Sequence, residues 1–498
     1  MNITQFIKYL NKAKGWGIQG AYYTHIDEWR RWWQGDYPAF HTIKAVGLDG
    51  NIHARQMYRM RMPKKACEDW ASLLLNDKTT VTVADMASST WLLGEDGRQT
   101  GGQLGQLDFW SSANALVELA FRSGTGAFVL SVEGLQVQGG AALPSPDARL
   151  CLDYLPAECI LPLTIRHGKV QEVAFASEVT LGGKSCIYLQ THQLVRVDGV
   201  DQYKISNEFF TSEHEETENA EYQPTDLPAG MAASFTTGSM TPWFSLFSPN
   251  VLKNIPAGPG LGMSVFAEAI DQVKQCDLAF DNYCRDLYLG GKKVFYSKNL
   301  LKSYVDKNGV AHQEAPDEIR QQLFFDTGNS DPDSKPEWYE YNPDLRVEDN
   351  SRAVQDALDY FSFKVGLGTH HYQFSSGAVK TATEYVGDRQ DMVQHANRHQ
   401  IPIEAALLQL FRAMLWAGKH LLGVPVDPDT AITINFDDSY ISDSETRRQR
   451  DKEDALDGFI PRYWYNMEWR GMSEAEARQA VQEAANESGA GDALNFGG

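Results

Sequence analysis

The sequence has few cysteines and no long apolar run, and these shortages exclude several classes of protein. Its 498 residues include six cysteines, with no CxxC pair and no zinc-finger spacing to histidine. We therefore expect reduced cysteines in the core of an intracellular protein, not a disulfide framework or a zinc site. No apolar run reaches 18 residues, and the N-terminus has no uninterrupted apolar segment. Neither a membrane span nor a signal peptide is expected.

Positive charge is also scarce. The 45 Lys and Arg residues face 66 Asp and Glu residues, which gives a formal net charge of −21. Affinity for nucleic acid comes mainly from Lys and Arg side chains that displace counterions from phosphates. The composition therefore argues against a protein whose main task is tight nucleic-acid binding, although it does not exclude contact with nucleic acid. Many soluble proteins are simply acidic.

Motifs of catalysis and nucleotide binding are incomplete or missing. Residues 181–185 resemble the end of a phosphate-binding loop, but Glu178 replaces its first glycine and the flanks have the pattern of strands. His395 and His399 have the i, i+4 spacing of a metal-binding pair, yet no HExxH acid is present, and we expect both on a polar, solvated helical face. No GxSxG and no strand-linked GxGxxG occurs. We assign no catalytic residue, metal or cofactor, and predict that the protein is not an enzyme.

The most informative stretch begins at Asn350 and predicts two helices joined by a loop. Apolar residues at helical spacing predict a helix over 351–365, with Asn350 as its N-cap. A second helix is predicted over 381–422, about forty residues or roughly 60 Å long. Pro402 lies inside it, so the helix should bend there. The connection over 366–380 is too long for a tight turn, which favours a functional or mobile loop.

Elsewhere helical and strand patterns alternate, and the fold class predicted is α+β. Helical spacing predicts further helices over 61–78, over 104–122, from a cap at Ser264 to about 289, over 445–465, and after Ser473, where Glu476 completes a capping box. A period of two predicts an antiparallel sheet with strands at 127–132, 150–154, 159–163, 172–176 and 185–189, and further strands near 293–297, 323–325 and 431–436. The Pro- and Gly-rich segment 223–262 reads as a hinge-like linker.

The first sixty residues are rich in aromatic and basic side chains. Basic residues interleaved with aromatics are one pattern of nucleic-acid stacking. The alternative is an arm that packs its tryptophans against a neighbouring surface, and the enrichment of Trp and Arg at protein interfaces favours it. The aromatic residues concerned are Tyr22, Tyr23, Trp29, Trp32, Trp33, Tyr37 and Phe40.

Three segments resemble a known family. They read YNPDLRVEDN at 341–350, FSFKVGLGT at 361–369 and VKTATE at 379–384, and together with the helix over 61–78 they resemble the portal proteins of tailed bacteriophages, in the branch that infects Gram-positive hosts. In that family a stem helix is followed by a tunnel loop and a long kinked helix, in the same order as here. The resemblance implies a dodecameric ring around the DNA channel at one vertex of the phage head, through which the genome is packaged and ejected.

The same resemblance implies a layout for the whole chain. Its parts in order are an N-terminal arm over 1–60, a wing of helices and antiparallel sheet over 61–262, a stem helix over 263–291, a clip over 292–346, a second stem helix over 347–366, a tunnel loop over 367–380, a long kinked helix that completes the wing over 381–436, a crown over 437–487 and a disordered tail over 488–498.

Some residues acquire expected roles from this layout. The tunnel loop would face the DNA, with His370, His371 and Lys380 as candidates for DNA contact. Alternatively these side chains make loop contacts between subunits, since residues of a positioned loop are often but not always functional. The bend at Pro402 would let the loop move with the ring. The side chains expected to pack the first stem helix are Val265, Ala269, Val273 and Phe280.

Partners and location also follow from the resemblance. Terminase and the head-tail connector would dock on the clip, and the ring would contact double-stranded DNA, the major capsid protein and scaffold protein. The chain would belong to the portal vertex of the virion and to the host cytoplasm during assembly, with no membrane partner. Acidic channel walls would let DNA slide. Eight Lys and Arg against twelve Asp and Glu over 292–349 favour protein docking there rather than phosphate binding.

A different class of function stays open as the alternative. Twelve tryptophans and 66 carboxylates are compatible with a hydrolase acting on polysaccharide. Such an enzyme would need secretion, a compact single fold and two catalytic carboxylates. The missing signal peptide and the long kinked helix weigh against it.

Overall fold

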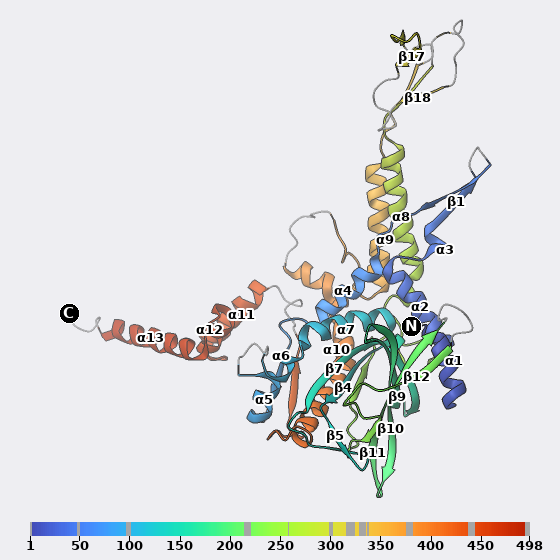
Figure 1. Cartoon of the computed structure of the whole chain (residues 1–498). Coiled ribbons are helices and arrows are strands. Elements are labelled where there is room, and N and C mark those ends of the chain that lie inside the picture. The colour runs from blue at the N-terminus through green and yellow to red at the C-terminus, as the bar shows by residue number, and fades with distance from the viewer. Residues whose placement is uncertain are drawn as a thin grey trace.

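A body of sheets and helices carries a slender two-helix projection (Figure 1). The computed structural model of the chain describes all residues except 1, 47–49, 96–100, 214–220, 257, 298–301, 315–323, 328–334, 336–337, 375–381, 437–443 and 494–498. The fold is mixed α+β, as the sequence pattern predicts. In Figure 1 the C-terminal helices leave the body on a different side from the projection.

Helices lie at both ends of the chain and flank a strand-rich middle. The α-helices are α1 (Ile3–Lys14), α2 (Ala21–Gln34), α3 (Pro38–His41), α4 (Met62–Leu74), α5 (Met86–Leu93), α6 (Gly102–Gln106), α7 (Phe109–Ser123), α8 (Ile270–Leu289), α9 (Val347–Lys364), α10 (Ala382–His420), α11 (Ser444–Asp457), α12 (Arg462–Arg470) and α13 (Glu474–Ala493). The 3-10 turns are η1 (Ala157–Cys159) and η2 (Ala267–Ala269).

The strands form two sheets in the body and smaller pairings elsewhere. They are β1 (Thr42–Val46), β2 (Ile52–Gln56), β3 (Thr80–Val83), β4 (Gly126–Glu133), β5 (Gln136–Gln138), β6 (Ala141–Leu143), β7 (Arg149–Pro156), β8 (Ile160–Arg166), β9 (Lys169–Leu181), β10 (Lys184–Val197), β11 (Val200–Glu213), β12 (Glu221–Thr225), β13 (Ser234–Thr236), β14 (Phe244–Phe247), β15 (Lys293–Tyr296), β16 (Lys302–Val305), β17 (Ala311–Glu314), β18 (Phe324–Asp326), β19 (Trp338–Tyr341) and β20 (Ile432–Asn435).

The five strands predicted as one antiparallel sheet are present but are divided between two sheets, because β4 and β7 pair with each other and not with β8, β9 and β10. The larger sheet has the order β5-β6-β13-β11-β10-β9-β8, with β12 added beside β11 and a parallel pairing between β13 and β6. A second sheet, β14-β4-β7, lies at the centre of the body, where the first five residues of β4 are buried. Helices α7 and α10 both contact β4, and α4 packs on α7. The apolar core therefore lies between these helices and the sheets.

Helices α8 and α9 form the projection, which we call the stem. They run in opposite directions, because the chain leaves the body along α8 and returns along α9 (Figure 1). At the far end lie β15–β19, which we call the tip. Its strand β15 pairs with β18 and β19, and β16 pairs with β17 around the expected turn near Lys307.

Several predicted helix limits are wrong. The helix predicted over 351–365 begins earlier, at Val347, so Asn350 lies inside α9 and is not its N-cap. The helix expected from Ser264 begins at Ile270, because Ser264 instead donates its hydroxyl to the carbonyl of Phe121 at 3.1 Å. The helix over 104–122 is two helices, α6 and α7, separated around Asp108, whose φ is 45°.

The C-terminal region differs from expectation in a similar way. The helix predicted over 445–465 is divided into α11 and α12, with Pro461 before the second because proline suits a helix start and not an interior. The capping box is confirmed, with the Ser473 N–H 3.0 Å from a Glu476 carboxylate oxygen. Helix α13 continues to Ala493, past the expected start of a disordered tail at 488.

Residues 223–262 are not a linker. This segment contributes strands β13 and β14, and β14 pairs with β4 in the central sheet. Trp243, Phe244 and Phe247 are all buried. The abundance of Pro and Gly misled the prediction, because short strands separated by turns have the same composition as a linker.

The N-terminal arm packs its tryptophans, but against its own chain. Trp29 and Trp32 of α2 belong to the buried core of the body. Phe6 of α1 packs edge-on against Phe210 and tilted against Tyr222 of the large sheet. The arm is therefore part of the body up to α3, and only the hairpin of β1 and β2 extends beyond it (Figure 1).

Candidate functional site

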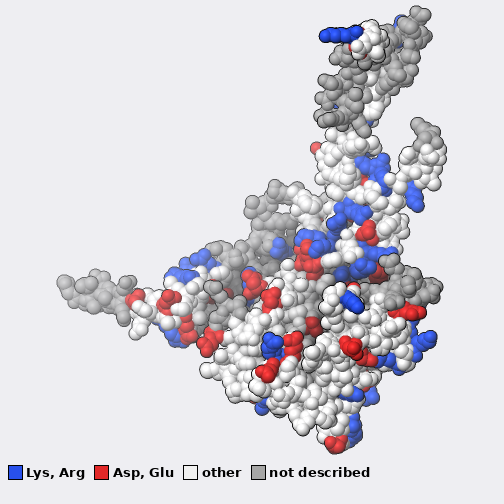
Figure 2. All heavy atoms as spheres, viewed as in Figure 1, with Lys and Arg blue, Asp and Glu red and all other residues white. Residues whose placement is uncertain are grey.

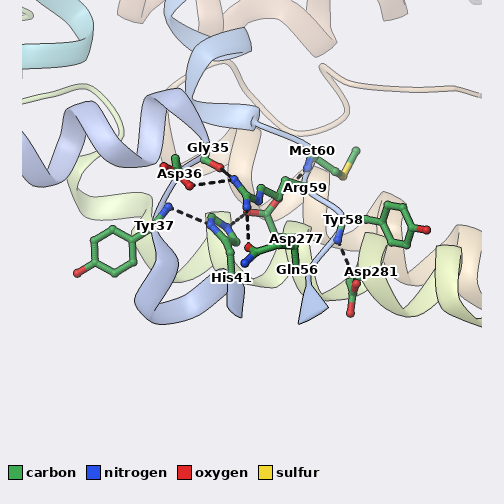
Figure 3. Close-up of polar contacts among 10 residues, drawn as sticks. All are labelled: Gly35, Asp36, Tyr37, His41, Gln56, Tyr58, Arg59, Met60, Asp277 and Asp281. Atoms are coloured by element: carbon green, nitrogen blue, oxygen red, sulfur yellow. Dashed lines mark hydrogen bonds and ion pairs between the residues drawn. The ribbon is translucent and has the colours of Figure 1, made fainter. Parts of the chain in front are cut away.

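The stem is attached to the arm through an aspartate that is buried on α8. Asp277 is 2% exposed, and one of its carboxylate oxygens lies 3.0 Å from Nε2 of the fully buried His41. The other oxygen accepts the N–H of Met60 at 2.7 Å. Because Nδ1 of His41 accepts the N–H of Tyr37 at 3.1 Å, Nε2 is the nitrogen that donates to Asp277 (Figure 3).

A second aspartate one turn along α8 makes a parallel attachment. The two oxygens of Asp281 accept from the two terminal nitrogens of Arg55 at 2.8 and 2.6 Å, and one of them also accepts the N–H of Tyr58 at 3.1 Å. The bidentate bond from Arg55 outweighs burial and lowers the pKa of Asp281 below its ordinary value. Together the two carboxylates hold β2 and the segment that follows it firmly against the stem.

Arg59 closes the same junction from the outside. One terminal nitrogen donates to the carbonyl of Gly35 and lies 3.3 Å from Asp36, and the other donates to the side chain of Gln56 at 2.9 Å (Figure 3). The end of α2 is thereby tied to the strand that returns from the hairpin. The donors and acceptors of this junction bind one another, so its role is structural: it holds the arm against the stem.

Lys and Arg side chains gather at this base of the stem on the face seen in Figure 2, interleaved with acidic ones. Lys64 is 2.5 Å from Glu68 and 3.2 Å from Glu118, and Lys65 pairs with Asp69. These cations are matched by carboxylates of the same chain. Their arrangement favours internal cohesion over phosphate binding.

Sequence analysis missed Asp277 and Asp281. They lie at i, i+4 on the helical face that also carries Val273, Cys276 and Phe280. Two acids within an otherwise apolar stripe are a usable signal, since a buried carboxylate requires a partner. The partners are more than two hundred residues earlier in the chain, and no local pattern identifies them.

The described part of the predicted tunnel loop lies against α4 and α9. His370, at φ 64°, places Nδ1 2.8 Å from Asp359 of α9. His371 has Nε2 3.8 Å from Asp69 of α4. Both candidates for DNA contact therefore face carboxylates of their own chain. Lys380, the third candidate, lies outside the described residues.

Tyr372 fixes this part of the loop most firmly. Its hydroxyl donates to Asp69 at 2.8 Å, and its carbonyl accepts from Gln355 of α9 at 2.7 Å. Burial raises the pKa of Tyr372 far above its ordinary value. Although burial opposes ionisation of Asp69, the nearby His371 and hydrogen bonds from Lys65 and Tyr372 lower its pKa overall. The loop begins as a docked segment, and Phe374 beyond it is 77% exposed.

The residues predicted to pack the first stem helix differ in their burial. Val265 and Ala269 are buried but precede the α-helix, Val273 is buried within it, and Phe280 is only partly buried. Helix α10 runs without interruption through Pro402. Its early and late parts nevertheless point in different directions (Figure 1).

The expectation of a solvated histidine pair on α10 is wrong for His399. This residue is 3% exposed and packs edge-on against Trp70 and Phe121, with ring centroids 4.8 and 5.0 Å away. Its Nδ1 accepts the N–H of Asn250 at 2.9 Å. Burial, together with nearby His395, lowers the pKa of His399 to about 3. It is a neutral core residue.

Other suspected motifs have structural explanations. The glycines at 182 and 183 form the turn between β9 and β10, with φ of 56° and 81°. Within the described part of the chain, no group of three His, Cys, Asp or Glu side chains is arranged to hold a metal ion. Residues 389–420 of α10 have the length and composition to cross a membrane, but over half of the apolar window is buried in the protein, as in a core helix.

The stem and tip expose an unusual number of large apolar side chains. On α9, Tyr360 and Phe363 are 61% and 59% exposed, and on β19 Trp338 is 58% exposed. Single exposed apolar residues are ordinary in proteins, whereas these lie on the two helices and one strand of a single projection. The further members of this series are Leu278, Leu287, Tyr288, Leu289, Tyr339, Tyr341, Leu345 and Val347.

A search with protein-family models and a search among curated proteins each found no match to the chain.

Proposed function

We propose that this chain is a portal protein, the subunit of a ring that forms the DNA channel at one vertex of a phage head. The observation that carries the proposal is the stem, a two-helix projection that ends in a β tip and exposes large apolar side chains along its length. Such a projection has too little core of its own to bury those side chains. Neighbouring copies side by side would cover them.

The energetics favour repeated contacts between copies. Full burial of one large apolar side chain is worth about 1.5–3 kcal/mol. Contacts that join different surfaces of identical copies generate a closed ring when the rotation between copies closes. A dodecamer, with wing, stem, clip and crown contributed by every subunit, is the assembly that the sequence resemblance implies.

The channel would be lined so that DNA slides. Channel walls that share the negative character of the chain, whose net charge is −21, would repel phosphates. The tunnel loop would approach the duplex through its part beyond Tyr372, since His370 and His371 face carboxylates and Tyr372 anchors what precedes. Lys380, which lies outside the described residues, stays a candidate for DNA contact. The change of direction along α10, with Pro402 inside the helix, would let the loop follow movements of the ring.

The tip would serve as the clip, where terminase docks during packaging and the head-tail connector afterwards. Aromatic residues on β19 suit protein docking, because Trp and Tyr are enriched at interfaces. The C-terminal helices would form the crown. Capsid and scaffold proteins would meet the ring during assembly in the host cytoplasm, and no catalytic step is assigned to the chain.

The test is the mass and symmetry of the purified protein. Native mass spectrometry combined with negative-stain class averages should show rings of twelve or thirteen subunits with a central hole. A chain that stays monomeric both alone and with scaffold protein, and that hydrolyses a glycan, would refute the proposal.

A further inference from the structure

The hairpin formed by β1 and β2 is poorly supported by the rest of the chain. Its two strands pair with each other and with no other strand among the described residues. Val46 and Ile52 face each other across its end and are 72% and 71% exposed. An isolated two-stranded hairpin is marginally stable in water. Contact with a further surface would therefore stabilise its end.

The base of the hairpin, in contrast, is rigidly attached. Arg55 of β2 is bound by Asp281, and His41, immediately before β1, is bound by Asp277. Both anchors belong to the stem helix α8. The hairpin consequently leaves the stem at a fixed angle and stands clear of it, on the side of α8 away from α9 (Figure 1).

The stem offers a complementary groove. A cavity of about 740 Å³ lies between α8 and α9, with apolar walls that include Phe280, Tyr283 and Val347. Glu348 and Asp356 also line it, against a single cation, Arg352. The groove is therefore apolar with a net negative charge, whereas the described part of the hairpin exposes Val46, Ile52 and the cation Lys44.

We infer that the hairpin of one copy docks in the α8–α9 groove of a second copy. Val46 and Ile52 would cover the apolar wall, and Lys44 would lie toward Glu348 and Asp356. The hairpin cannot serve its own groove, since its anchored base directs it away from its own stem. A projection and a groove on the same chain join identical copies head to tail, and that contact repeats around a ring. The inference rests on the proposed ring and names a contact that holds it together.

Charge reversal tests the contact in the full-length protein. Lys44→Glu should raise the concentration needed for half-maximal ring formation roughly two- to fivefold, because an exposed ion pair is weak but is repeated at every interface. Glu348→Lys in the same chain should restore assembly. Lys184→Glu, at an exposed position in the large sheet, makes the same charge change and should leave assembly unaltered. Native mass spectrometry gives the ring fraction for each variant.

Cross-linking tests the geometry. A Val46→Cys, Ser351→Cys double variant, treated with a short bismaleimide, should give a ladder of covalent oligomers on a denaturing gel, because Ser351 lines the groove. Each single variant, which keeps the six native cysteines, should give no ladder.

The outcomes separate the inference from the proposed function. Normal rings from Lys44→Glu, together with no ladder from the Val46→Cys, Ser351→Cys variant, would overturn the hairpin contact and leave the ring intact. A wild-type chain that forms no ring, alone or with scaffold protein, would defeat the proposed function before any variant is made. A photo-cross-linker can also be attached to the cysteine of the Val46→Cys variant. If it labels only capsid protein in complete particles, the inference is overturned.

Discussion

Strands β4 and β19 have similar apolar content and opposite environments. In β4 the first five residues are buried beneath α7 and α10, whereas all four residues of β19 in the tip are exposed. Apolar composition alone therefore does not reveal whether a strand completes its own core or awaits another chain. The body has a large apolar core, whereas the stem and tip leave many of their large apolar side chains exposed. This contrast supports the proposal that copies of the chain assemble, and it can be tested in the unassembled chain.

The largest expected effect comes from emptying the core of the body. Trp70 is fully buried and donates its indole N–H to the carbonyl of Val365 at 3.1 Å. Trp70→Ala should lower the free energy of unfolding by about 3–5 kcal/mol, because it leaves a cavity. Trp338→Ala, in the exposed tip, should change it by less than about 0.5 kcal/mol. Urea unfolding of the monomer measures both, and equal losses would contradict the comparison.

An intermediate effect is expected at the junction of body and stem. Asp281→Asn keeps the shape of the side chain but removes the charge that Arg55 binds, and should cost about 1–3 kcal/mol. Because the pKa of Asp281 is lowered in the folded protein, its contribution is present above the unfolded value near 4 and is lost as the pH falls below it. Asp286→Asn is the control, since its partner Arg346 is largely exposed. Equal loss of stability in both variants would show that burial at Asp281 has no special role.

A smaller effect should follow mild acid. His192 and His399 are buried in the body with pKa values lowered to about 3, whereas the unfolded chain binds protons near pH 6.5. Stability is therefore nearly full above about pH 7 and falls below it, by about 1.4 kcal/mol per histidine between pH 7.5 and 5.5. Chemical unfolding across this range should show the slope, and His399→Gln should reduce it. An unchanged slope in that variant would mean that His399 is protonated in the folded chain.

The smallest effect on the monomer should come from the stem. Tyr360→Ser with Phe363→Ser removes two exposed side chains and should leave the free energy of unfolding within about 0.5 kcal/mol of wild type. Assembly should nevertheless fail, because in the proposed ring this surface would be covered by a neighbouring copy. Phe363→Leu retains apolar surface and should retain rings in negative stain. Normal rings from the double variant would remove this part of the stem from the interface.

Sequence patterns predicted the elements whose signals are local. Pro63 near the start of α4 and the Ser473–Glu476 capping box both mark helices that the structure contains. The alternating strands of the large sheet were also predictable, because their period reflects one buried face. The limits of α9 and α7 were not, since Asn350 resembles a cap and Asp108 resembles an ordinary helical residue.

The candidate site was less predictable than the fold. Its defining contacts join residues of the arm to α8 through side chains that show no local periodicity, and Asp277 and Asp281 resemble surface acids until their partners are known. His399 was misjudged for the opposite reason, because its aromatic neighbours Trp70 and Phe121 come from other helices. Tertiary contacts decided each of these cases.

The contacts of His41 and Arg55 with α8 join residues that are synthesised at different times. His41 and Arg55 leave the ribosome early, but their carboxylate partners follow 236 and 226 residues later. Until α8 has been made, the hairpin has no fixed direction and a buried histidine has no acceptor. The direction of the hairpin is therefore fixed only after more than half of the chain has been synthesised, so a nascent chain shorter than this cannot present the hairpin as the finished protein does.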